Sequence, residues 1–220
     1  MIIDHNDPEY ARLWRYSGAN RWNGAYYYSQ EIVANIIPNV ATDRNWVTVH
    51  VEGRCLDHSI VFIHNNLNPH LYDWMAAYYD LVLVCGTPDT TMRMRRLGRT
   101  VYLPLSVDVG YVRSFMRIKT KGTAYAGRPS KRCGEGAVFN VPAGVSLLEN
   151  MPRRRFLASM AEYERVYAVG RCAIEAKVLG CEVLPYDPRY PDPSVWRVVD
   201  NIEAAAMLQV ALDGIDGRIR

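Results

Sequence analysis

The sequence predicts an α/β fold built from two halves, each with a mainly parallel sheet. Short apolar runs of strand length alternate with segments whose apolar residues have helical spacing, and parallel α/β folds show this alternation. The chain has 220 residues, enough for one large domain or two small ones. Hydrophobic residues make up 49% of it and charged residues 22%, so a sizeable core can be buried.

Four runs in the first half read as strands because they are short, rich in β-branched and aromatic residues, and bounded by Gly, Asn or Pro. They are residues 46–51, 59–64, 81–85 and 100–105. Three helices are expected beside them, at 23–37, 69–79 and 88–97. Pro38 should stop the first helix, and Pro88 suits the first turn of the third, where a backbone N–H is not needed.

The strand pattern restarts after a basic, polar zone at 111–122. Strands are expected at 123–127, 137–141, 164–169 and 182–186, with helices at 152–160, 172–179 and 193–212, the last broken near Asp200. The predicted plan is a first half over 1–112, a second over 123–200, and a C-terminal helix and tail over 201–220 that packs back on the first half. A single continuous sheet is the alternative.

Several protein classes are disfavoured by the bulk sequence. No run of about 18 apolar residues occurs, and the N-terminus lacks a basic stretch followed by an apolar one, so neither a transmembrane helix nor a signal peptide is expected. The five cysteines form no C-x-x-C pair, which favours free thiols and a cytoplasmic protein. Cys85 and Cys181 adjoin apolar runs and are expected in the core.

Charge is unevenly distributed although the net charge is only +3. Residues 92–132 contain eleven basic residues and one acidic residue, Asp108. A local positive field attracts phosphates or nucleic acid, and interleaved aromatic residues would add base stacking. The aromatic residues of this segment are Tyr102, Tyr111, Phe115 and Tyr125. A solvated basic surface is the alternative.

The stretch 170–187 is predicted to form the helix and second strand of a βαβ unit, after the strand at 164–169. Ligands bind such units at the carboxyl ends of the strands. Glu175, in the first turns of the helix, can accept hydrogen bonds from ribose hydroxyls, while Gly170, Arg171 and the helix N-terminus favour an anion. An ordinary helix with a solvated Glu is the alternative.

A second candidate loop runs from Gly127 to Gly134 and carries Arg128, Lys131 and Arg132. Glycines let the backbone approach a ligand closely, and the cations suit a diphosphate. A basic surface turn is the alternative. Both loops are expected at equivalent strand ends of the same half, which makes the combination more specific than either loop alone.

Two further polar segments are candidates for ligand contact. His64 follows the strand at 59–64 together with Asn65, where a histidine is well placed for acid–base chemistry. Asn20 lies in a Gly-bounded loop at 18–24 that leads into a helix. A histidine that caps the next turn and a simple helix start are the alternatives.

Motifs for other enzyme classes are absent from the sequence. It contains no D-x-D, no H-E-x-x-H, no G-x-S-x-G, no G-x-G-x-x-G and no P-loop. These absences argue against a metal-bound phosphate site, a zinc protease, an α/β-hydrolase and a standard dinucleotide dehydrogenase.

Taken in order, these pieces resemble the GT-B glycosyltransferases, enzymes with two Rossmann-like halves facing a cleft. The matching stretches are His64-Asn65-Asn66, Leu103 to Asp108, Gly127 to Gly134, and Glu175-Ala176 with Gly180 to Val183. The resemblance implies Arg128 with Lys131 or Arg132 for the donor diphosphate and Glu175 for its ribose. It also implies an acceptor-side or sugar-contacting His64, with Asp108 in the matching 103–108 element. Tyr167 stands eight positions before Glu175, where many members carry another Glu.

The function implied by this resemblance is transfer of a sugar from a nucleotide-diphosphate donor to a hydroxyl acceptor, without metal or other cofactor. The nucleotide sugar would be a co-substrate, and the acceptor a glycan, a small molecule or a nucleic acid bound through residues 92–132. The alternative is a non-catalytic module that binds a nucleotide or nucleic acid in the same basic cleft.

Overall fold

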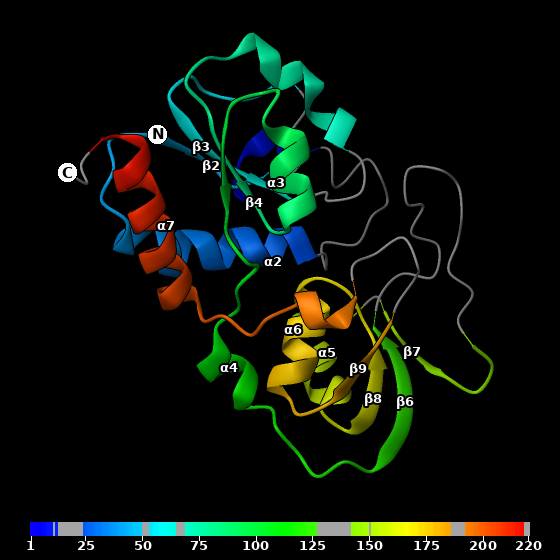
Figure 1. The fold of residues 1–220 in the computed structure, drawn as a ribbon. Coiled ribbons are helices and arrows are strands. Elements are labelled where there is room, and N and C mark those ends of the chain that lie inside the picture. The colour runs from blue at the N-terminus through cyan, green and yellow to red at the C-terminus, as the bar shows by residue number, and fades with distance from the viewer. Residues whose placement is uncertain are drawn as a thin grey trace. The chain divides into compact units, whose positions relative to one another are not determined.

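The protein is described by a computed structural model for residues 1–10, 12, 24–49, 53–64, 69–126, 142–149, 151–185 and 192–217. The chain forms two compact units, one made of residues 1–104 and 201–220 and the other of residues 105–200. Each unit contains one parallel sheet with helices, so the predicted α/β class is confirmed (Figure 1). The boundary lies at Pro104 and Leu105, earlier than the predicted 112, because α4 (Val109–Arg113) packs against a helix of the second unit.

The sheet of the first unit has five parallel strands that follow one another in chain order. They are β1 (Ile2–Ile3), β2 (Asn45–Val47), β3 (Ser59–Ile63), β4 (Val82–Cys85) and β5 (Arg99–Tyr102). Four of them correspond to predicted strands, whereas β1 was missed because two residues show no period. All residues of β3 and β4 are buried, which explains their unbroken apolar sequences.

One face of this sheet is covered by the 3₁₀ helix η3 (Pro69–Ala77) and by α3 (Pro88–Met94). Tyr72, Met75 and Met94 belong to the same buried cluster as alternate residues of β3 and β4. Thr87 caps α3, since its hydroxyl accepts a hydrogen bond from the Thr90 backbone N–H at 3.2 Å.

The other face carries α2 (Gly24–Glu31), its π-helical continuation η1 (Ile32–Ile36) and the 3₁₀ turn η2 (Ile37–Asn39). The edge of the Tyr28 ring meets Phe62 of β3 at a centroid distance of 6.1 Å. The C-terminal helix α7 (Asn201–Ile215) packs against η1 and η2 (Figure 1). The last segment of the chain therefore belongs to the unit that contains its first segment.

The sheet of the second unit has four parallel strands in the order β7-β6-β8-β9. Their bounds are β6 (Lys121–Ala126), β7 (Ser146–Leu148), β8 (Tyr163–Tyr167) and β9 (Glu182–Leu184). Strand β7 was not predicted, and the predicted strand at 137–141 lies outside the described residues. Because β7 lies on one side of β6 and β8 on the other, the strand order reverses at β6.

Helices α5 (Arg153–Met160) and α6 (Arg171–Val178) match the two predicted helices of this unit. Their buried residues form one core with the sheet, including Leu157, Met160 and Ile174. The predicted break near Asp200 is confirmed, because η4 (Pro193–Val195) ends before it and α7 begins after it. Cys85 and Cys181 are buried as predicted. Within the described residues, no helix is long and apolar enough to cross a membrane.

Candidate functional site

The reversal of strand order in the second unit marks its candidate site. Strands β6 and β8 are neighbours, with Tyr125 paired to Tyr167 near their carboxyl ends. Ligands of parallel α/β sheets bind where the strand order reverses, in the crevice beyond the carboxyl ends of the strands. The segments that follow Ala126 and Tyr167 therefore both begin at this point. Arg128, Lys131 and Arg132 of the first segment lie outside the described residues.

Gly170 forms the turn between β8 and α6, at the N-cap position of the helix. Its backbone angles are φ 61° and ψ −134°, a conformation that L side chains rarely adopt. A Cβ added there would meet only Leu105 Cδ1, at an ordinary 3.7 Å. The backbone angles rather than lack of space require glycine, and the turn directs the chain from the strand end into α6.

Glu175 lies in the second turn of α6 and is 4% exposed. Its Oε1 is 2.9 Å from Nη2 of Arg153 and 3.5 Å from Nη2 of Arg171. These arginines are the first residues of α5 and α6, so the ion pairs bring the two helix N-termini together. The shared carboxylate therefore joins two guanidinium groups at the first residues of α5 and α6, and helix N-termini favour an anion.

The contacts of Glu175 bear on its predicted role. Sequence reasoning assigned its carboxylate to a ribose, and the structure shows it buried between two arginines. The ribose contact stays a prediction. Arg153 was missed because it lies 22 positions before its partner, although a helix over 152–160 was expected there.

In the first unit, His64 follows β3 at the carboxyl edge of the sheet. Its Nε2 donates a hydrogen bond to the backbone carbonyl of Thr48 at 2.7 Å, since a carbonyl can only accept. The Nε2 proton is therefore held by the backbone, and proton exchange with a substrate would use Nδ1. Asn65 and Asn20 lie outside the described residues.

A second histidine, His5, follows β1 at the same edge and was missed by sequence reasoning. Its Nδ1 is 3.3 Å from the Ser29 hydroxyl, which in turn is 2.7 Å from the Thr48 hydroxyl. Burial lowers the pKa of His5. Together with His64, which bonds the Thr48 carbonyl, the side chains of His5, Ser29 and Thr48 link α2 with the ends of β1, β2 and β3. If β1 were longer, its sequence pattern would have predicted a strand, and His5 would have been recognised as a histidine at its end.

Asp108 serves as the N-cap of α4. Its side chain accepts a hydrogen bond from the Tyr111 backbone N–H at 2.7 Å. This local role accounts for an acidic residue within a basic segment, because N-caps favour Asp.

The basic segment 92–132 is divided between the two units. Its arginines up to Arg99 belong to the first unit, whereas its residues from Leu105 onward belong to the second. Carboxylates from outside the segment pair with several of its cations, and Tyr125, expected among the interleaved aromatic residues, is fully buried. The ion pairs are Arg93–Asp89, Arg96–Asp73, Arg99–Asp80, Arg117–Glu162 and Lys121–Glu162. Counting the charged residues within 92–132 does not reveal these carboxylates, because they lie outside the segment.

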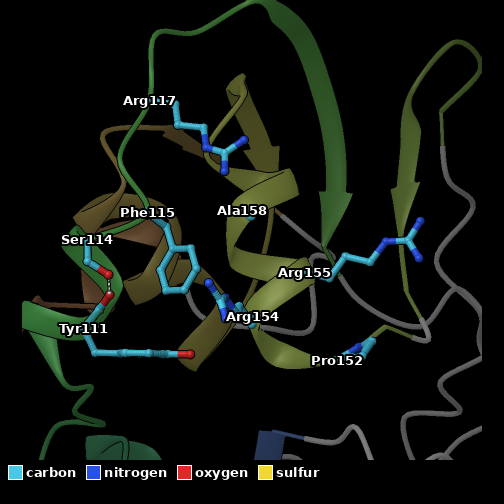
Figure 2. Close-up of a pocket in the computed structure, with 8 residues that line it drawn as sticks. All are labelled: Tyr111, Ser114, Phe115, Arg117, Pro152, Arg154, Arg155 and Ala158. Atoms are coloured by element: carbon cyan, nitrogen blue, oxygen red, sulfur yellow. Dashed lines mark hydrogen bonds between the residues drawn. The ribbon is translucent and has the colours of Figure 1, made fainter.

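An open hollow with a volume of about 830 Å³ lies in the second unit, between α4 with its following residues and the first turns of α5. Figure 2 shows Tyr111 and Phe115 on one side and Arg154 on the other, near the two rings. Figure 2 also shows that Arg155 leaves α5 in a different direction. The lining residues are Tyr111, Ser114, Phe115, Arg117, Pro152, Arg154, Arg155 and Ala158.

Among the residues that the structure describes, no three His, Cys, Asp or Glu side chains form a group that could hold a metal ion. Comparison of the chain with protein-family models, with curated proteins and with solved structures finds no match.

Proposed function

We propose that the protein is a glycosyltransferase that moves a sugar from a nucleotide-diphosphate donor to a hydroxyl acceptor, and that its second unit binds the donor. The supporting observation is the adjacency of β6 and β8. Because of it, the segments that follow Ala126 and Tyr167, each of which carries a sequence-predicted ligand motif, begin at one edge of the sheet. A donor diphosphate at this edge would lie near the Gly170 turn and the α6 N-terminus.

The proposed reaction needs few chemical groups. The acceptor oxygen forms a bond to the anomeric carbon, while the bond from that carbon to the diphosphate oxygen breaks and the diphosphate leaves with the electron pair. A base accepts the acceptor's proton. Positioning and stabilisation of the departing negative charge supply most of the catalysis in such a transfer.

Cations would stabilise the diphosphate in this proposal. Arg128 with Lys131 or Arg132 supplies them from the segment after β6, and no metal ion is needed. Arg153 and Arg171, which share Glu175, are the first residues of α5 and α6. Arginine is suited to this role because it offers paired donors to phosphate oxygens.

His64 is the proposed base on the acceptor side. With its Nε2 proton held by the Thr48 carbonyl, neutral His64 would accept a proton at Nδ1. Replacement by Gln should lower turnover and leave donor binding unchanged, since the donor site is assigned to the other unit. Loss of donor binding in this variant would contradict the assignment of the donor to the second unit and of the acceptor-side base to the first.

Thermal unfolding with a panel of nucleotide sugars, combined with donor hydrolysis, tests the proposal. A donor at about 100 times its Kd should add about 2.7 kcal/mol to the free energy of unfolding. The stabilisation should be lost in Arg128→Ala and kept in Arg93→Ala, a matched loss of charge in the exposed part of α3. Failure of every nucleotide sugar to stabilise the wild-type protein would overturn the proposal.

A ribose comparison tests the predicted contact of Glu175. If its carboxylate binds ribose, the wild-type protein should prefer a nucleoside diphosphate over the 2′-deoxy form, and Glu175→Gln should lose this preference. If Glu175 only positions the two arginines, both affinities should fall by the same factor. Glu182→Gln is the matched control, because Glu182 is an exposed residue of β9.

The second candidate function is non-catalytic nucleotide binding at the same edge. The burial of Glu175 between Arg153 and Arg171 favours it, because this arrangement holds an anion site without an exposed acidic side chain at that position. Stabilisation by nucleoside diphosphates without hydrolysis or transfer of any sugar would favour this function over the enzyme.

A further inference from the structure

We propose that the hollow between α4 and α5 binds single-stranded nucleic acid, with phosphates against its arginines and a base stacked on its exposed aromatic side. Of the donor-site residues that the structure describes, neither Gly170 nor Glu175 lines the hollow.

The charge of the hollow is the first argument. Among the described residues that line it, three are arginines and none is acidic. Arg154 and Arg155 are exposed, and no described residue forms an ion pair with either of them. Arg117 is partly neutralised by Glu162, 3.4 Å away. The unneutralised charge therefore lies at the first turns of α5, where a phosphate also meets the positive end of the helix.

The aromatic side of the hollow is the second argument. Tyr111 is 41% exposed, and its ring meets Phe115 edge to face at a centroid distance of 5.2 Å. The guanidinium of Arg153 lies 5.9 Å from the centre of the Tyr111 ring. These contacts hold the tyrosine ring in place while leaving much of it accessible. Phosphate-binding arginines beside a fixed, accessible ring are the combination that binds single strands without strict sequence preference.

A single strand fits this hollow better than a duplex. Stacking on Tyr111 requires an unpaired base, because a base within a duplex is already stacked on its neighbours. Arg155 leaves α5 in a direction different from that of Arg154 (Figure 2), so it extends the positive surface for the next phosphate of the strand.

Fluorescence anisotropy of a labelled 12-nucleotide pyrimidine DNA strand, titrated with the full chain at several salt concentrations, tests the inference. Replacement of both Arg154 and Arg155 by Gln should weaken binding at least about tenfold and reduce the salt slope by about 1.4, or about 0.7 per lost phosphate contact. The matched control replaces Arg93 and Arg95 by Gln, the same charge change on exposed residues of the first unit, and should change affinity less than twofold. Equal losses in both variants would overturn the proposed site.

Two substitutions of Tyr111 test the proposed stacking of a base on its ring. Tyr111→Leu should weaken binding at least about fivefold, whereas Tyr111→Phe should stay within about twofold, because only the ring is required. Unfolding temperatures of both variants check that the fold is kept. No binding of the strand by the wild-type protein, equal affinity for the matched duplex, or equal effects of the two substitutions would each overturn the inference.

Discussion

Gly170 shows how one residue controls the candidate donor site. Its positive φ sets the path from β8 into α6, and a side chain there would be strained even though space is available. We expect Gly170→Ala to lower the free energy of unfolding by about 1–3 kcal/mol. Gly122→Ala is the control, since a Cβ there meets nothing within 4 Å and its φ is not positive. Urea unfolding of both variants measures the difference, and equal stabilities would contradict the strain argument.

Glu175 is the residue whose function and stability effects must be separated. Its removal leaves Arg153 and Arg171 buried without their shared carboxylate, so Glu175→Gln should cost about 3–5 kcal/mol of stability. Chemical denaturation measures this loss, and binding assays must be run where the variant remains folded. A loss below about 1 kcal/mol would mean that water or other groups around the two arginines replace the carboxylate.

At the scale of elements, α7 illustrates a helix whose position only long-range packing explains. Leu208 is fully buried where α7 packs in the first unit, whereas Val210 is 63% exposed. Leu208→Ala should lower the free energy of unfolding by about 2–5 kcal/mol and Val210→Ala by no more than about 0.5 kcal/mol. Thermal or urea unfolding of the two variants checks the pair. Comparable losses would place the contact face of α7 elsewhere.

At the scale of the whole molecule, an ion cluster joins distant parts of the first unit. Arg44 has a 3% exposed side chain and pairs with Asp80 at 3.1 Å and with Asp216, which follows α7, at 2.8 Å. His58 and Arg99 also contact Asp80. Arg44, His58, Asp80 and Arg99 precede or begin strands, so the cluster lies at the amino ends of the strands, on the edge opposite to His64.

Because of this ion cluster, we expect the first unit to lose stability at acidic pH. Burial by itself raises the pKa of Asp80, but hydrogen bonds from His58 and Arg99 and the charge of Arg44 outweigh it and lower the pKa to about 2. Because the folded pKa lies below the unfolded value of 3.8, the stabilisation is complete above about pH 4 and is lost as the pH falls towards 2. Urea midpoints measured between pH 5 and 2 should fall, and in Asp80→Asn they should fall less.

Asparagine is the appropriate replacement because Asp80 has a φ of 52°, a conformation that Asn tolerates. The variant should be less stable at pH 7 with donor binding unchanged, since the proposed donor site belongs to the other unit. An unaltered pH profile would show that Asp80 does not carry the acid sensitivity.

Local patterns predicted much of the fold. Buried strands such as β3 and β4 were found because strands covered on both faces are continuously apolar, and α3 because Pro88 and Gly98 bound it. Strands β1 and β7 were missed because two or three residues show no period. Helix α4 was missed because its five residues are too few to show a helical period and its cap, Asp108, was interpreted as a ligand contact.

The sequence by itself determined the α/β class, the break before α7 and the order along the chain of the strands other than β1 and β7, because these depend on neighbouring residues. It also placed candidate ligand residues after β6 and after β8. Only the tertiary structure decided that these strands are adjacent, that Arg153 reaches Glu175, and that distant carboxylates neutralise many cations of 92–132. Such contacts join residues from 4 to 45 positions apart, and most exceed the range of any local pattern.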